Sequence, residues 1–168
     1  ELRKLWNDIS AILKNKKQRI WICGHSLGGA MATLCASRLE ELEPTLYTYG
    51  SPRVGGSEWR DGCDVEHYRF VNNNDIVTAV PLWLMGYRHH GAVRYIDYYG
   101  RIKRLTFGQK VKDQILGRWK ALTKFQLFDG IYDHDIAGGY ADKLQALWFE
   151  GREKIRKRAN VGHDRKNV

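Results

Sequence analysis

The chain opens with three segments of regular hydrophobic pattern. Residues 2–13 carry apolar side chains at helical spacing and predict an amphipathic helix. Residues 20–23 form a continuous apolar run, which is typical of a strand buried on both faces of a parallel sheet. The helical period returns over residues 27–42, until Pro44 prevents a helix from continuing. This part of the chain therefore predicts a helix, a strand and a second helix.

Strand patterns follow in the middle of the chain. Residues 45–49 and 66–71 have the pattern of strands, and turn-forming residues end each of them. The later elements are an antiparallel hairpin, a basic amphipathic helix, a loop and a last helix, over residues 92–105, 109–122, 125–135 and 140–148. Because strands and helices alternate, we expect an α/β protein with a mostly parallel sheet, flanking helices and a C-terminal hairpin.

Composition narrows the class of protein. The 168 residues are 43% apolar and 28% charged, with no internal repeat or linker, which favours one globular domain. The three cysteines are odd in number and none pairs at the spacing of a zinc site, so we expect neither a disulfide framework nor a metal. This cysteine usage favours the cytoplasm. The chain begins at Glu1, however, and its natural N-terminus is expected to lie upstream.

A candidate nucleophile lies between the first strand and the helix that follows it. The pentapeptide Gly-His-Ser-Leu-Gly at 24–28 fits the nucleophile elbow, in which Ser26 occupies a sharp turn from strand to helix. Its two glycines are expected to remove Cβ atoms that would collide where strand and helix meet. Leu27 begins the helix, so its backbone N–H is expected to point at a developing oxyanion.

A serine nucleophile needs a general base and an orienting carboxylate. In this class of fold the acid follows the serine along the chain, and the histidine follows the acid. Asp75 comes directly after the strand at 66–71 and is the first candidate for the acid. Asp97, in the hairpin, is the alternative, although a turn role explains it more simply.

Six histidines compete for the role of base. Three are set aside. His25 lies inside the elbow, where its side chain is expected to diverge from that of Ser26, and His67 lies within a strand. His163 lies in a polar tail that is expected to be mobile. His134 lies in the loop before the last helix, downstream of Asp75 as the order requires. Spacing alone leaves His89 and His90 open as alternatives.

Several segments together resemble the class 3, fungal-type lipase family. They are residues 20–29, 47–55, 73–81 and 86–91 and the pair Asp133-His134, and they follow one another in order. The resemblance implies an α/β-hydrolase fold and hydrolysis of carboxylic esters, usually acylglycerols or phospholipids, without metal or cofactor. It also implies that Ser26 is the nucleophile, Asp75 the acid and His134 the base.

The chain departs from the family pattern at its N-terminus. Family members carry further strands before the elbow, a lid, and a Ser or Thr that completes the oxyanion hole; loss of one oxyanion donor typically costs roughly 10²–10³ in rate. Residues 1–150 are therefore expected to be the C-terminal portion of a hydrolase core, and residues 151–168 a basic extension. Residues 83–85 are expected to pack in the core, with the acyl pocket as the alternative.

The net charge of +9 is concentrated away from the candidate site. Residues 1–20, 101–124 and 151–168 together hold 21 basic and 5 acidic side chains, and the rest of the chain holds 7 and 14. No nucleic-acid recognition module is found, so a nucleic-acid partner is not expected. Attraction of the helix at 109–122 to an anionic lipid surface fits a lipase better. The alternative function is a non-catalytic hydrolase fold that binds anionic lipid or a partner.

Overall fold

The computed structural model describes residues 4, 7, 11–12, 19–73, 75–97, 99–103 and 134–164, with side chains up to Lys154 in the last helix. Residues 4, 7, 11 and 12 are helical, as the pattern over residues 2–13 predicts. The predicted helix at 109–122 and all but the end of the predicted loop at 125–135 lie outside the described residues.

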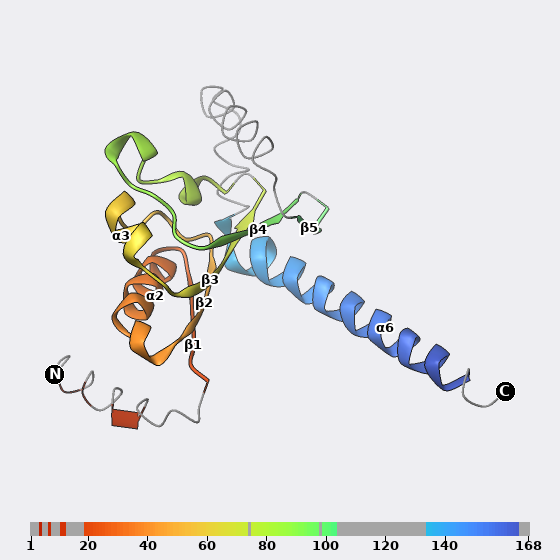
Figure 1. Ribbon diagram of the computed structural model, residues 1–168. Helices are drawn as coiled ribbons and strands as arrows, with labels where there is room; N and C mark the ends of the chain where they lie inside the picture. Colours follow the sequence, from red (N-terminus) through yellow and green to blue (C-terminus); the bar gives the residue numbers. More distant parts are fainter. Residues whose placement is uncertain are drawn as a thin grey trace, which may run out of the picture.

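A five-stranded sheet with the order β1-β2-β3-β4-β5 organises the fold (Figure 1). The first four strands run parallel, and β5 pairs antiparallel with β4. They are β1 (Trp21–His25), β2 (Thr45–Tyr49), β3 (Glu66–Asn72), β4 (Ala92–Ile96) and β5 (Ile102–Lys103). The mostly parallel sheet and the C-terminal hairpin predicted from sequence are confirmed, with strand bounds that differ by a residue or two.

Helix α2 (Leu27–Arg38) covers one face of β1 and β2 (Figure 1). Its contact is made through small side chains, since its buried residues are Gly29, Ala32, Thr33 and Ala36. Two apolar positions that define the predicted helical period, Met31 and Leu34, are instead 64% and 46% exposed. The reason is close packing, because small side chains let the helix approach the sheet and larger ones then face outward. The helix also ends earlier than predicted, and the 3₁₀ turn η1 (Glu40–Leu42) leads to Pro44.

The prediction that the first strand is buried on both faces is wrong. Trp21 is 72% exposed and Cys23 is exposed, whereas Ile22 between them packs against the core of Ala32, Ala36, Leu46 and Val65. Within the described residues β1 is an edge strand, covered by α2 on one face only. Its apolar side chains therefore alternate between the core and the solvent.

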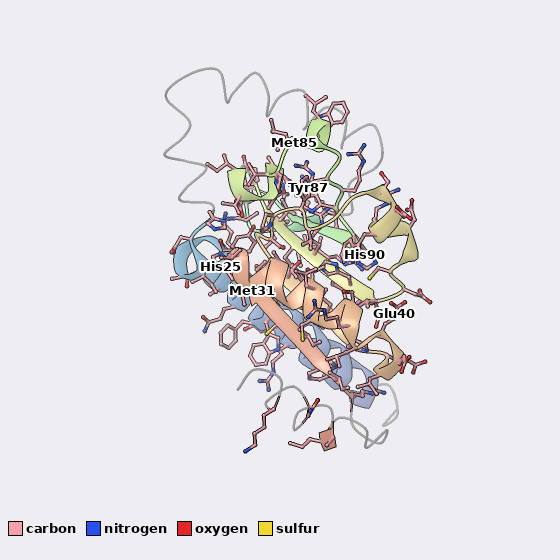
Figure 2. The ribbon with its side chains drawn as sticks, turned by 90° about the vertical axis from the view of Figure 1, so that its left-hand side faces the viewer. His25, Met31, Glu40, Met85, Tyr87 and His90 are labelled. Atoms are coloured by element: carbon pink, nitrogen blue, oxygen red, sulfur yellow. The ribbon has the colours of Figure 1, made fainter. Side chains whose placement is uncertain are left out.

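Three short helices in the connections were not predicted, because none is long enough to show a hydrophobic period. They are α3 (Ser57–Gly62), η2 (Ile76–Ala79) and η3 (Trp83–Met85). The expected core packing of η3 is wrong, since Trp83, Leu84 and Met85 are 45%, 66% and 67% exposed. They lie in the connection from β3 to β4, which projects beyond the sheet, as the labelled Met85 in Figure 2 illustrates.

The chain ends in a π-helical segment, η4 (Ile136–Ala141), that continues into α6 (Asp142–Asp164). The predicted last helix is confirmed and is longer than expected. α6 runs through the tail around His163 as far as Asp164, so this segment is helical, and its expected mobility stays a prediction. The same helix crosses the expected boundary at residue 150. The division of the chain into a core and a basic extension stays a prediction. Figure 1 shows α6 pointing away from the sheet. No described helix has the length and hydropathy needed to cross a membrane.

Candidate active site

The turn between β1 and α2 places Ser26 at the carboxyl edge of the sheet. Ser26 has φ 55° and ψ −129°, a strained backbone conformation for a residue with a side chain. A Cβ on Gly24 would lie 2.2 Å from the Gly28 carbonyl oxygen, so this position requires glycine. At Gly28, however, a Cβ would meet nothing within 4 Å, and the predicted steric need is wrong there. The strained elbow therefore depends on the first glycine of the motif.

The structure brings the three predicted residues Ser26, Asp75 and His134 together from distant parts of the chain. The His134 Nε2 atom lies 2.8 Å from Ser26 Oγ, and its Nδ1 atom lies 3.0 Å from Asp75 Oδ1. The carboxylate only accepts, so Nδ1–H donates to Asp75 and Nε2 accepts the Ser26 hydroxyl proton. This tautomer leaves the imidazole ready to remove that proton.

The Asp75 carboxyl is buried, with a side chain that is 0% exposed. Burial raises its pKa above the ordinary value, and hydrogen bonds from Tyr140, His134 and the Val77 backbone oppose that rise. The Val77 N–H donates to Asp75 Oδ1 at 2.9 Å and holds the carboxyl at the start of η2. Three donors thus aim at one desolvated carboxylate.

Tyr140 is a site residue that sequence reasoning missed, because its apolar character counted only toward the last helix. Its side chain is 1% exposed, and its hydroxyl lies 2.5 Å from Asp75 Oδ2. The Asn72 backbone N–H donates to the same hydroxyl oxygen at 3.0 Å. A buried phenol requires a hydrogen-bond partner, and this requirement was the available signal.

His25 was also missed, since only its position beside Ser26 was considered. Its Nε2 atom lies 2.8 Å from the carbonyl oxygen of His134, to which Nε2–H donates. The two imidazole rings stack with centroids 4.8 Å apart. Figure 2 labels His25 beside the first turns that follow His134. It contacts both the backbone and the ring of the histidine that faces Ser26.

The structure does not bring the alternative residues to Ser26. Asp97 forms ion pairs with Arg101 and Lys103 in the hairpin. Burial raises its pKa, but hydrogen bonds from those two residues outweigh burial and hold the pKa well below its usual range. His89 Nε2 donates to the Thr78 carbonyl at 2.7 Å, and His90 Nε2 donates to the Cys63 carbonyl at 3.0 Å.

Leu27 is the first residue of α2, and its backbone N–H belongs to the first turn of the helix, where amides have no intrahelical acceptor. This placement fits the predicted oxyanion donor. Over the part of the chain that the structure describes, no group of three or more His, Cys, Asp or Glu side chains is arranged to hold a metal ion.

Known proteins are similar to part of this chain in sequence and in structure. The sequence model of the family Lipase (class 3) matches residues 2–85. The toxin TseL of Vibrio cholerae is 41% identical over 76 residues, which cover 42% of this chain and 12% of TseL. Secreted mono- and diacylglycerol lipase 1 of Fusarium solani is 33% identical over 106 residues, or 55% of this chain and 32% of that lipase.

A solved structure agrees with this result. The lipase from Rhizopus microsporus var. chinensis superposes with a TM-score of 0.52 at 30% identity, covering 56% of this chain and 37% of that one. The chain spans about a third or less of the length of TseL and of the Fusarium solani lipase. From the family match and the sheet architecture, this chain belongs to the class 3 lipase family and has an α/β-hydrolase fold.

Proposed function

We propose that the chain carries the catalytic triad of a carboxylic-ester hydrolase, with Ser26 as nucleophile, His134 as general base and Asp75 as the orienting acid. The observation that carries the proposal is the His134 ring, which bridges Ser26 Oγ at 2.8 Å and Asp75 Oδ1 at 3.0 Å. Both distances fall within the range in which a base removes a proton from a nucleophile that is itself hydrogen-bonded to it.

The reaction begins with attack of Ser26 Oγ on the ester carbonyl carbon. As the Oγ–C bond forms, the hydroxyl proton passes to His134 Nε2 and the carbonyl oxygen becomes an oxyanion. Asp75 stabilises the imidazolium through Nδ1–H. The Leu27 N–H, at the positive end of the α2 dipole, donates to the oxyanion.

The intermediate then collapses to an acyl-enzyme. The ester C–O bond breaks, and the alkoxide oxygen leaves as an alcohol with the proton from Nε2. Water attacks the acyl-enzyme by the same route, because His134 removes a water proton and later returns a proton to Ser26 Oγ. The products are a carboxylic acid and an alcohol, and Ser26 is regenerated.

The substrate class is an ester of a lipid, and acylglycerols are the first candidates. The Fusarium solani relative is named for mono- and diacylglycerols. Exposed apolar side chains also follow the acid along the chain, at Val80, Leu82 and η3. Exposed apolar side chains of this kind suit contact with an acyl chain or a lipid interface. A role for residues 109–122 at an anionic membrane stays a prediction, because they lie outside the described residues.

Labelling with a fluorophosphonate probe tests the nucleophile directly. We expect the folded chain to label, and the Ser26→Ala variant to lose the label. The matched control is Ser37→Ala in α2, the helix that follows Ser26. This variant removes a hydroxyl that donates only to the Leu34 carbonyl among the described residues. A folded chain that stays unlabelled contradicts the proposal, and binding of anionic vesicles by that unlabelled chain would support the non-catalytic alternative.

Hydrolysis of a short-chain nitrophenyl ester tests the base. The His134→Ala variant is expected to lose turnover, whereas His89→Ala and His90→Ala are expected to retain it in proportion to their folded fraction. Equal losses in all three variants at equal folded fraction would remove His134 from the assigned role.

A further inference from the structure

The turn that follows β2, residues 50–53, lies at the same edge of the sheet as Ser26, because β1 and β2 are parallel. Its sequence is Gly-Ser-Pro-Arg, and the proposed reaction uses none of these residues. The Ser26 N–H donates to the carbonyl of Tyr49, the last residue of β2, and the Gly50 N–H donates to the Phe70 carbonyl of β3. The turn therefore begins beside both the elbow and the strand that leads to the acid.

Gly50 lies against the pair formed by Asp75 and His134. Its backbone has φ 58°, and a Cβ placed on it would lie 2.6 Å from Asp75 Oδ2 and 3.0 Å from His134 Nδ1. The first distance is shorter than a Cβ atom allows and the second is tight, so a side chain here would displace the carboxylate or the imidazole. The Gly50 backbone thus forms one wall of the acid–base pair.

Ser51 packs against the first turn of α2. Its side chain is buried, and a Cβ placed on Gly29 would lie 2.8 Å from Ser51 Cβ. The Ser51 hydroxyl donates to the Pro52 carbonyl at 3.1 Å, within the turn itself. The turn therefore also contacts the helix that begins with Leu27, whose N–H is the proposed oxyanion donor.

Arg53 joins the turn to the connection that follows the acid. Its backbone N–H donates to the Val80 carbonyl at 2.8 Å, and its Nη1 donates to the carbonyls of Ala79 and, at 2.7 Å, of Pro81. Three consecutive carbonyls at the end of η2 thus accept hydrogen bonds from one residue. Two of these bonds come from a charged donor, which makes them stronger than bonds between neutral groups.

The short helix η2 connects these carbonyls to the carboxyl of Asp75. At the start of η2, Asp75 Oδ1 accepts from the Val77 N–H at 2.9 Å, and the Asp75 carbonyl accepts from Thr78 Oγ1 at 2.8 Å. Only one helical turn separates these contacts from Ala79, which Arg53 holds. A shift of the backbone at Ala79 would therefore move the backbone that orients the carboxylate.

We propose that residues 50–53 position the catalytic triad and that Arg53 is the positioning side chain. The inference rests on the proposed ester hydrolysis. Arg53 acts through η2 and Asp75, and it fixes the carboxylate beside His134 without itself contacting the reacting atoms. Gly50 keeps the space next to that pair free of a side chain.

Hydrolysis of a water-soluble, short-chain nitrophenyl ester tests Arg53. For Arg53→Gln we expect kcat per folded molecule to fall about tenfold with KM within about twofold, because a displaced acid misplaces the base and leaves substrate binding intact. Arg53→Lys keeps a cationic donor and should recover part of the loss. The matched control is Arg88→Gln, which removes a guanidinium that binds the Trp83 and Tyr87 carbonyls of the same connection, beyond η2. Its kcat should be unchanged.

A measurement that needs no turnover separates this inference from the proposed function. The N–H that His134 donates to Asp75 should give a low-field proton NMR signal, identified by its loss in His134→Ala. We expect this signal to move upfield in Arg53→Gln, because the hydrogen bond lengthens, and to keep its position in Arg88→Gln. An unaltered chain that hydrolyses no ester contradicts the proposed function, whereas the NMR signal still decides the role of Arg53.

Two alanine variants test the turn if Arg53→Gln does not fold. Gly50→Ala should displace the acid–base pair and lower kcat at least about tenfold at equal folded fraction. Gly86→Ala also places a side chain at positive φ, 87°, but its Cβ would meet nothing within 4 Å, so it should keep kcat. The proposal is overturned if Arg53→Gln folds and keeps both kcat and the NMR signal, or if Gly50→Ala keeps full kcat.

Discussion

The Tyr140 hydroxyl lies 2.5 Å from Asp75 Oδ2, and both groups are buried. The phenol therefore donates to Oδ2 of the carboxylate, and His134 Nδ1 lies 3.0 Å from Oδ1 and 3.1 Å from Oδ2. Tyr140 belongs to η4, six residues after His134, so one short segment supplies both donors. We therefore propose Tyr140 as a positioning residue for Asp75, the proposed acid.

Replacing Tyr140 by Phe removes one donor from Asp75 and should raise the pKa of that carboxyl further above its ordinary value. We expect a loss of roughly 1.5–3 kcal/mol of stability, the range for a hydrogen bond to a charged group. We also expect the acidic limb of the kcat/KM profile to move to higher pH. Urea unfolding and pH–rate profiles measure the two effects.

Tyr47→Phe is the matched control, because it removes a phenol hydroxyl from β2 while keeping the ring stacked on Tyr68. Its pH profile should equal that of the unaltered chain. An unchanged profile in Tyr140→Phe itself would show that the phenol does not act on Asp75.

The contact between His25 and His134 predicts an effect on turnover rather than on binding. His25→Phe keeps a ring for stacking but removes the donor to the His134 carbonyl, so the base loses part of its support. We expect kcat to fall about tenfold, equivalent to 1.4 kcal/mol, with KM little changed. His25→Gln, which retains an N–H donor, should restore part of the rate. A rise in KM alone, or no difference between Phe and Gln, argues against positioning.

The two glycines of the elbow should respond in opposite ways to alanine. Gly24→Ala places a Cβ 2.2 Å from backbone oxygen and should cost roughly 1–3 kcal/mol and most probe labelling of Ser26. Gly28→Ala meets open space inside α2 and should add about 0.5–1 kcal/mol of stability. Thermal unfolding and fluorophosphonate labelling distinguish them. Similar losses in both variants would contradict the packing described for the elbow.

Acid should destabilise the fold through His67. Its pKa falls from 6.5 in the unfolded chain to about 3 in the folded one, so between these values unfolding takes up a proton. Stability should therefore be lost as pH falls below 6.5, by about 1.4 kcal/mol per pH unit from this residue. His67→Gln should remove about 2 kcal/mol of the decline between pH 7 and pH 5, while His89, also shifted downward, maintains the remainder. Equal declines in urea unfolding of both chains would exclude His67 as the source.

The sequence by itself determined the features that depend on neighbouring residues. The elbow at Ser26, the strands β2 and β3 and the hairpin at Gly100 follow from local pattern, and the strand-helix alternation is enough to predict a parallel sheet. The order of serine, acid and histidine fits Ser26, Asp75 and His134 but leaves His89 and His90 open, and the resemblance to the class 3 lipase family selected His134. Their catalytic role remains a proposal.

Only the tertiary structure decided which distant groups meet. The hydroxyl of Tyr140 reaches Asp75 and the ring of His25 reaches His134 because parallel strands end at the same edge of the sheet and η4 returns to it. The hydrophobic pattern also did not predict which side chains are exposed. It marks α2 as a helix but does not show how closely α2 packs on the sheet, and in the structure Met31 faces solvent. In the sequence, Arg69 is an ordinary cation of a strand. Only the fold shows that its side chain is buried, away from the water that would otherwise screen its charge.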